Sequence, residues 1–302
     1  MNSNFRNKSG RMLVGLLSII MILSCTLTFN INRVEASGKN EKKETLKILA
    51  IGNSFAYNTL HYVSEMATEL GYEDVVVGNL YIGGCSLNKH WKNARENRAV
   101  YEYGKKNGKL NQKKWRRKYD VSMDQALLDE EWDYIVMLQY SGDSGKLKTY
   151  KNLNKLVKFV KKRINKNTKL IWNMTWAYQG NYKKKRFAYY KYDQKLMYKK
   201  IVKVTKRKIK KNKNFIMVIP SGTVIQNART SSYGDHFTVD GRHLNKKARY
   251  MASLGFVCTL LDVKPEKVSY QPKGITKKTR IIAIEAVNEA INNSYNITKV
   301  NK

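Results

Sequence analysis

Short apolar runs rich in β-branched residues alternate along the chain with longer stretches in which apolar positions recur at helical spacing. The alternation indicates an α/β fold with three layers, α/β/α, around a doubly wound, mainly parallel five-stranded sheet. Five buried strands are predicted at residues 46–52, 73–84, 132–139, 169–176 and 214–220. Helices are predicted near residues 59–70, 150–164, 244–256 and 276–292, together with a long basic helix that carries Phe187, Tyr190, Met197, Ile201 and Val204 on one face.

One connection is too long for this simple alternation. Residues 88–132 include the basic stretch "KHWKNARENRAVYEYGKKNGKLNQKKWRRKYD" between the second and third predicted strands. We interpret it as a basic insertion: a helix, then a hairpin or loop around "KNGKLNQ". A second helix over "SMDQALLDEEW" returns the chain to the sheet.

The start of the chain is typical of an export signal. Basic residues precede the apolar run "MLVGLLSIIMILSCTLTF", and "VEA" at 34–36 offers a small-residue cleavage site. We favour a signal peptide over residues 1–36, a polar linker over 37–45 and one domain over 46–302, which predicts a secreted or cell-surface bacterial protein with no membrane span after cleavage. A retained membrane anchor or a lipid attached at Cys25 are the alternatives.

Charge narrows the choice of partners. The chain has 58 Lys and Arg against 23 Asp and Glu, a net charge of +35. A field of this strength attracts polyanions. Export favours anionic cell-wall polymers, and the basic runs lack an interleaved aromatic recognition motif, which disfavours nucleic acid. Only Cys85 and Cys258 follow the signal, and they form neither a disulfide framework nor a zinc motif, so we expect no metal and no cofactor.

The candidate chemistry lies where predicted strands end. "ILAIGNSFAY" places Ser54 directly after the first strand, and "DGRH" places Asp240 three residues before His243, after the fifth strand. A carboxylate at this spacing can orient an imidazole, whose other nitrogen can take a proton from a serine. Each motif alone also has a simpler explanation, a helix cap or a turn. Their joint position at one edge of the sheet favours catalysis.

With these residues in view, the chain resembles the SGNH (GDSL-type) hydrolases. "IGNSF" and "DGRHLN" are similar to the first and last conserved blocks of that superfamily. Together with "GGCSL", "WDYIVMLQYS" and "MTWAY", they are most similar to a branch of bacterial proteins, the DUF4886 domain, over about residues 46–261. The resemblance implies a flavodoxin-like fold and a serine hydrolase that needs no metal or cofactor.

The resemblance also implies roles for individual residues. Ser54 would be the nucleophile and His243 the general base, oriented by Asp240. The backbone N–H of Gly84, or less favourably of Gly83, would bind the oxyanion. Where many members carry GxND, this chain has Gln139, which we expect to replace the asparagine as an oxyanion donor, with a strand-end amide satisfied by its own hydrogen bonds as the alternative.

Two further positions complete the expected site. Trp176, at the end of the fourth strand, is a candidate surface for stacking on a sugar ring, with core packing as the alternative. Asn53 stands where aspartate is usual in the superfamily, and we expect this difference to have little effect. Asn53 is not the nucleophile.

The resulting hypothesis is an exported serine esterase or deacylase. Its substrate would be an acylated carbohydrate or another ester, most simply an O-acetyl group on a surface or extracellular glycan. Acyl transfer in place of hydrolysis stays open. The alternative hypothesis is a catalytically weak, basic binding protein for anionic wall polymers on the same scaffold.

Overall fold

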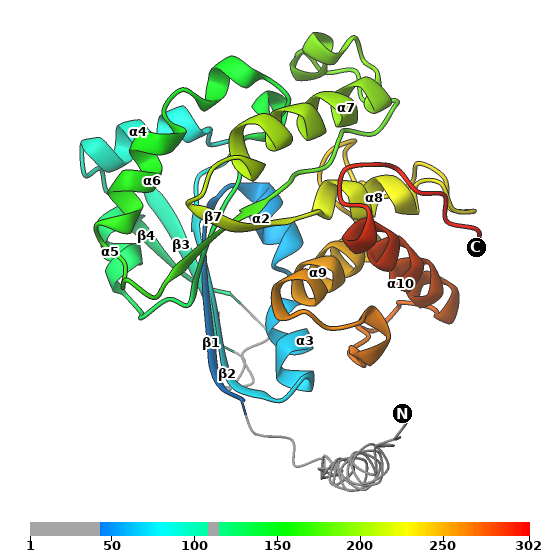
Figure 1. The fold of residues 1–302 in the computed structure, drawn as a ribbon, viewed down its shortest axis with the longest axis horizontal. Helices are drawn as coiled ribbons and strands as arrows, with labels where there is room; N and C mark the ends of the chain where they lie inside the picture. The colour runs from blue at the N-terminus through cyan, green and yellow to red at the C-terminus, as the bar shows by residue number, and fades with distance from the viewer. Residues whose placement is uncertain (1–42, 108–114) are drawn as a thin grey trace, which may run out of the picture. The chain divides into compact units, whose positions relative to one another are not determined.

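The computed structural model describes residues 43–107 and 115–302, and its centre is a seven-stranded sheet with the order β4-β3-β2-β1-β5-β6-β7 (Figure 1). β2, β1, β5, β6 and β7 run parallel, whereas β3 and β4 are antiparallel. The strands are β1 (Lys43–Gly52), β2 (Tyr72–Tyr81), β3 (Tyr101–Asn107), β4 (Arg116–Val121), β5 (Tyr134–Met137), β6 (Lys169–Asn173) and β7 (Phe215–Ile219).

The three-layer, mainly parallel fold is confirmed. In chain order the five parallel strands are arranged 2-1-3-4-5, the flavodoxin-like order, which puts a topological switch point at β1 and β5. The predicted count of five strands is wrong, because the basic insertion adds β3 and β4 beyond β2. Of the expected N-terminal parts, the signal 1–36 lies outside the described residues. β1 already begins at Lys43, inside the expected linker 37–45.

Helices cover both faces of the sheet. In Figure 1, α4, α5 and α6 gather on one side, and α2, α3, α9 and α10 on the other. No helix within residues 43–107 and 115–302 is long and apolar enough to cross a membrane. The α-helices are α2 (Ser54–Thr59), α3 (Val63–Glu69), α4 (Leu87–Arg95), α5 (Met123–Leu128), α6 (Leu153–Lys161), α7 (Gln194–Thr205), α8 (Ser221–Ala228), α9 (Lys246–Leu261) and α10 (Lys277–Asn292).

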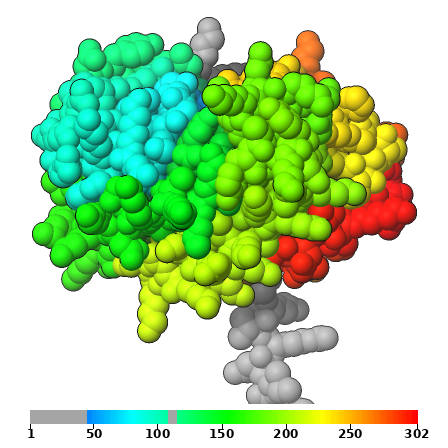
Figure 2. All heavy atoms as spheres, turned by 90° about the horizontal axis from the view of Figure 1, so that it is seen from above, coloured from blue at the N-terminus to red at the C-terminus, as the bar shows by residue number. Residues whose placement is uncertain are grey.

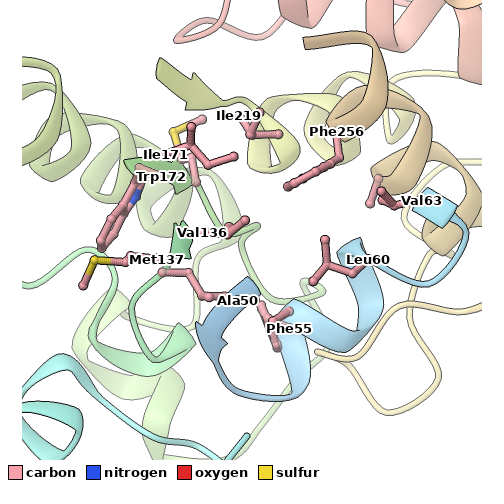
Figure 3. Packing of buried hydrophobic residues seen from close by; sticks show 14 of the residues in the cluster. Ala50, Phe55, Leu60, Val63, Val136, Met137, Ile171, Trp172, Ile219 and Phe256 are labelled. Carbon is pink, nitrogen blue, oxygen red and sulfur yellow. The ribbon is translucent and has the colours of Figure 1, made fainter. Parts of the chain in front are cut away.

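The core follows from the alternation of side chains along each strand. In β6, Ile171 and Trp172 are both buried and point to opposite faces (Figure 3). Phe256 of α9 and Leu60, just after α2, pack on the face that Ile171 shares. Because both faces are covered, the parallel strands read as continuous apolar runs, which is why the sequence located them.

The predicted long basic helix is interrupted. A 3₁₀ segment, η3 (Lys185–Tyr190), and α7 are separated by Lys191 and Tyr192, both with a positive φ (54° and 57°). α7 then continues as one π-helical segment, η4 (Lys206–Lys210). Apolar spacing continues across the break, so periodicity alone could not detect it. The five residues expected on one face are all buried: Phe187, Tyr190, Met197, Ile201 and Val204.

Close backbone packing joins α8 to the end of β6. The Gly222 N–H donates to the carbonyl of Met174 at 2.8 Å, and a Cβ at Gly222 would lie 2.3 Å from the Thr175 carbonyl oxygen. Only a residue without a side chain fits this contact.

We therefore expect Gly222→Ala to lower the free energy of unfolding by about 1–3 kcal/mol, because the added methyl group forces α8 away from the sheet. Urea unfolding followed by circular dichroism measures this. Gly180→Ala is the matched control, since the nearest atom to its Cβ is 3.4 Å away. Equal losses in the two variants would contradict the explanation.

Candidate active site

Ser54 lies at the junction between β1 and α2. Asn53 is the N-cap of α2: its Oδ1 accepts from the Phe55 N–H at 3.0 Å, and its Nδ2 donates to the Cys85 carbonyl at 3.2 Å. The capping role is therefore taken by Asn53, and the hydroxyl of Ser54 is free for another partner. The alternative explanation of Ser54 as a helix cap is wrong.

That partner is His243, whose Nε2 lies 2.8 Å from Ser54 Oγ. The Nδ1 of the same ring lies 2.7 Å from Asp240 Oδ2. An ionised carboxylate only accepts hydrogen bonds, so Nδ1 carries the proton and Nε2 accepts from the serine hydroxyl. The other oxygen of Asp240 accepts from the backbone N–H groups of Arg242 and His243, at 3.1 and 2.8 Å. The structure thus brings Ser54, His243 and Asp240 together in one hydrogen-bonded chain.

Two contacts hold the histidine loop against α2. The Leu244 N–H donates to Asn58 Oδ1 at 2.5 Å, and the Trp176 indole N–H donates to the Arg242 carbonyl at 2.8 Å. The Trp176 ring also stacks on Phe55, with centroids 4.1 Å apart. Trp176 is fully buried, so its expected role as a stacking surface for substrate is wrong. It instead joins the two loops that carry the serine and the histidine.

The environment favours a neutral imidazole and an ionised carboxylate. Burial lowers the pKa of His243 below its ordinary value; the hydrogen bond to Asp240 raises it again only in part, and Arg242 lowers it further. For Asp240, burial raises the pKa, but hydrogen bonds from His243 and Arg242 outweigh burial and leave it below its ordinary value. His243 can therefore accept a proton at neutral pH.

The space in front of Ser54 is a pocket of about 370 Å³. Gly84 lies on its wall with φ at +61°, the left-handed region, in the turn that follows β2. As the first residue of α2, Ser54 has a backbone N–H without an acceptor in the helix. The N–H groups of Ser54 and Gly84 are therefore the candidate oxyanion donors. The lining residues are Ser54, Tyr81, Gly83, Gly84, Tyr140, Arg186, Arg242 and His243.

Gln139 does not reach this pocket. Its side chain is buried, and Nε2 donates to the carbonyl and the hydroxyl of Thr149 at 3.3 and 3.2 Å. Its Oε1 accepts from the N–H groups of Leu87 and Tyr140 at 3.0 and 2.9 Å. The predicted role of Gln139 as an oxyanion donor is therefore wrong. The glutamine stem is long enough to turn its amide into the protein, where it ties three loops together.

Two other histidines and both cysteines of the described residues lie outside this pocket. His90 is buried and contacts the Tyr101 hydroxyl at 3.1 Å, and His61 packs against Tyr62. Burial raises the pKa of the Cys85 and Cys258 thiols to about 12, which leaves them unreactive. In the part of the chain that the structure describes, no group of His, Cys, Asp and Glu is arranged to hold a metal ion.

Four lining residues were not recognised in the sequence: Tyr81, Tyr140, Arg186 and Arg242. Arg242 lies between Asp240 and His243, and Tyr140 directly follows the third predicted strand, so their positions were available as signals. Arg186 comes from a lysine-rich run with no local mark of function. Figure 2 views the molecule from above the strand ends, where cyan, green and lime segments of the chain lie side by side.

Fold and site define a doubly wound α/β protein with a Ser–His–Asp array at the carboxyl edge of its sheet. The chain belongs to the DUF4886 family, described as a domain of unknown function, which matches residues 47–290. The predicted membership of this family is confirmed. No protein with a curated description matches the chain.

The solved structures that are similar to this chain include the following three. A DUF4886 family protein from Bacteroides uniformis is 36% identical with a TM-score of 0.79, covering 85% of this chain and 98% of that one. A candidate SGNH hydrolase from Slackia heliotrinireducens is 18% identical (TM-score 0.44; 72% and 99% covered). An α/β hydrolase enzyme from the metagenome of Lake Arreo, Spain, is 10% identical (TM-score 0.40; 72% and 94% covered).

The position of Gln139 can be tested by Gln139→Ala. Loss of its amide leaves the Leu87 and Tyr140 N–H groups without their acceptor, so we expect the free energy of unfolding to fall by about 1–3 kcal/mol. Loss of an oxyanion donor would instead lower kcat by about 10²–10³-fold. Unfolding curves and ester turnover per folded molecule separate the two. Normal stability with kcat reduced 100-fold would restore the donor role.

Proposed function

We propose that the protein is a serine hydrolase that cleaves carboxylic esters, with Ser54 as nucleophile, His243 as general base and Asp240 as its orienting carboxylate. The observation that carries this proposal is the unbroken chain of hydrogen bonds from Ser54 Oγ through the imidazole to Asp240, at 2.8 and 2.7 Å. Such a chain activates a hydroxyl that is otherwise a poor nucleophile at neutral pH.

The chemistry follows from this geometry. Ser54 Oγ attacks the acyl carbonyl carbon while its proton passes to His243 Nε2. The Ser54 and Gly84 N–H groups bind the oxyanion that forms. The intermediate expels the alcohol, whose oxygen takes the proton from His243, and an acyl-serine remains. Water then attacks the acyl-serine with the same histidine as base, which releases the acid and restores Ser54.

Access of water favours hydrolysis over acyl transfer. The side chains of His243 and Asp240 are 22% and 41% exposed, so the site does not exclude water from an acyl-serine. The predicted export signal and the positive charge favour an O-acyl group, such as acetyl, on an extracellular or surface glycan. The alternative, a basic binding protein without turnover, would have no use for the aligned triad.

Ser54→Ala should lower kcat for hydrolysis of p-nitrophenyl acetate by at least ~10³-fold, since the hydroxyl that His243 activates is then absent. His243→Ala should lower kcat by at least ~10³-fold, because the hydroxyl then lacks its base. Release of p-nitrophenol measures both variants. Ser269→Ala, at an exposed serine far along the chain, is the matched control and should retain the wild-type rate. Equal turnover by wild type and Ser54→Ala would exclude the proposed nucleophile, and absence of turnover in both would favour the binding protein.

The pH dependence should reflect the lowered pKa of His243. The base works only when neutral, so kcat/KM should rise with pH as His243 loses its proton and level off above. Because burial lowers that pKa, the half-maximal value should lie below pH 6.5, the ordinary value. Measurements of kcat/KM from pH 4 to 9 test this, and a half-maximal value above pH 7 would contradict it.

A further inference from the structure

A second, larger pocket adjoins the one that contains Ser54. It has a volume of about 620 Å³ and shares three wall residues with the catalytic pocket, Tyr140, Arg186 and Arg242. The two hollows therefore form one continuous surface at the carboxyl edge of the sheet. The complete lining of the larger pocket is Tyr140, Tyr182, Lys184, Lys185, Arg186, Asp240 and Arg242.

Four of these seven residues are cations and only one is an acid. The acid is Asp240, whose oxygens are already bonded to His243 and Arg242. Among the described residues, no ion pair engages Lys184, Lys185 or Arg186. The pocket therefore carries positive charge that the protein itself does not neutralise.

We propose that this pocket binds an anionic group, a carboxylate or a phosphate, carried by the alcohol part of the ester substrate; this rests on the proposed esterase activity. The assignment to the alcohol part follows from proton transfer. His243 gives its proton to the leaving oxygen, so the alcohol lies beside the imidazole, and the turn of Asp240 and Arg242 that flanks the imidazole forms a wall of the basic pocket. The substrate class is an acylated unit of an anionic polymer. A ring in that unit would lie beside Tyr140 and Tyr182, the two tyrosines of the larger pocket.

Arg186 and Arg242 lie where the two pockets meet and can form charge-assisted hydrogen bonds with an oxyanion. Arg242 also donates from Nε to Asp240 at 3.3 Å, which leaves its terminal nitrogens for substrate. Lys184 and Lys185 lie at the start of η3 and are exposed, so they contribute attraction without a fixed geometry.

The test uses three acetyl esters that differ only at the para position of the alcohol: methyl 4-acetoxybenzoate, 4-acetoxybenzoate and 4-acetoxyphenyl phosphate. Each kcat/KM is divided by the rate of the same ester with hydroxide, which removes differences between leaving groups. For the wild type at low salt we expect an anionic-to-neutral ratio of about five or more, falling toward one at high salt, where charges are screened. The arm with the higher ratio distinguishes carboxylate from phosphate.

Lys184→Gln/Lys185→Gln should bring this ratio toward one, and Lys184→Glu/Lys185→Glu should bring it below one. Lys208→Gln/Lys211→Gln removes the same charge near the opposite edge, before β7, and should keep the wild-type ratio. An anionic-to-neutral ratio that is equal in the wild type and in the two double variants of Lys184 and Lys185 would overturn the inference. So would an equal loss in the control, because the general field would then explain the preference.

A binding measurement separates this inference from the proposed function. Ligand-observed NMR with 4-hydroxyphenyl phosphate and 4-hydroxybenzoate on Ser54→Ala reports the anion pocket without turnover. We expect binding that weakens at least fivefold in Ser54→Ala/Lys184→Gln/Lys185→Gln. If wild type hydrolyses no ester but this binding is seen, the proposed function fails and the anion pocket stands. If esters are cleaved but both lysine variants bind and discriminate as the parent does, only the anion pocket fails.

Discussion

The hydrogen bond from the Leu244 N–H to Asn58 Oδ1 joins two segments 186 residues apart, and the candidate site depends on it. Asn58 lies on the helix that begins with Ser54, and Leu244 directly follows His243. Both residues are buried, so breaking this bond would leave the Leu244 N–H and the Asn58 Oδ1 without a hydrogen-bond partner in the interior. The contact therefore fixes the distance between the hydroxyl and the imidazole, which a flexible loop alone would not keep within bonding reach.

A second constraint comes from Asn53. Its Oδ1 fixes the start of α2 and its Nδ2 holds the Cys85 carbonyl, next to Gly84. The two candidate oxyanion donors, the N–H groups of Ser54 and Gly84, thus lie on segments joined by one amide. An aspartate at this position could accept from Phe55 but could not donate to Cys85. The asparagine therefore has a structural role that its position before Ser54 did not suggest.

The sequence was sufficient to predict those parts of the fold that follow a simple, repeated pattern of apolar residues. Buried parallel strands give apolar runs, and their carboxyl ends share one edge, which is why the sequence alone predicts that Ser54 and His243 lie close together. The basic insertion was predicted to contain a hairpin or loop, and β3 and β4 form an antiparallel pair there. That the pair extends the sheet was not predicted, because "YEYGKKN" and "RRKYDV" mix charge with few apolar positions. β3 pairs with β2, and β4 pairs with β3, so their place in the sheet depends on neighbouring strands more than on their own periodicity.

The direction of individual side chains could not be predicted from the sequence. Gln139 and Trp176 both lie near strand ends, as expected of site residues, yet both turn into the protein and bond to neighbouring loops. Position along a strand predicts the edge of the sheet that a residue reaches, but the choice between pocket and core is made by partners distant in sequence. Arg186 shows the converse, since a residue of an ordinary lysine run reaches the pocket in front of Ser54 through the fold alone.

The strong positive charge and the proposed acid–base chemistry support each other. Cations close to an imidazole disfavour its protonated form, and Arg242 and Arg249 both act on His243 in this direction. The same Arg242 lines the pocket into which we place the anionic part of the substrate. The same positive charges, Arg242 among them, therefore keep His243 neutral and attract anions to the adjoining pocket. An acidic pocket would repel the same substrate and raise the pKa of the base.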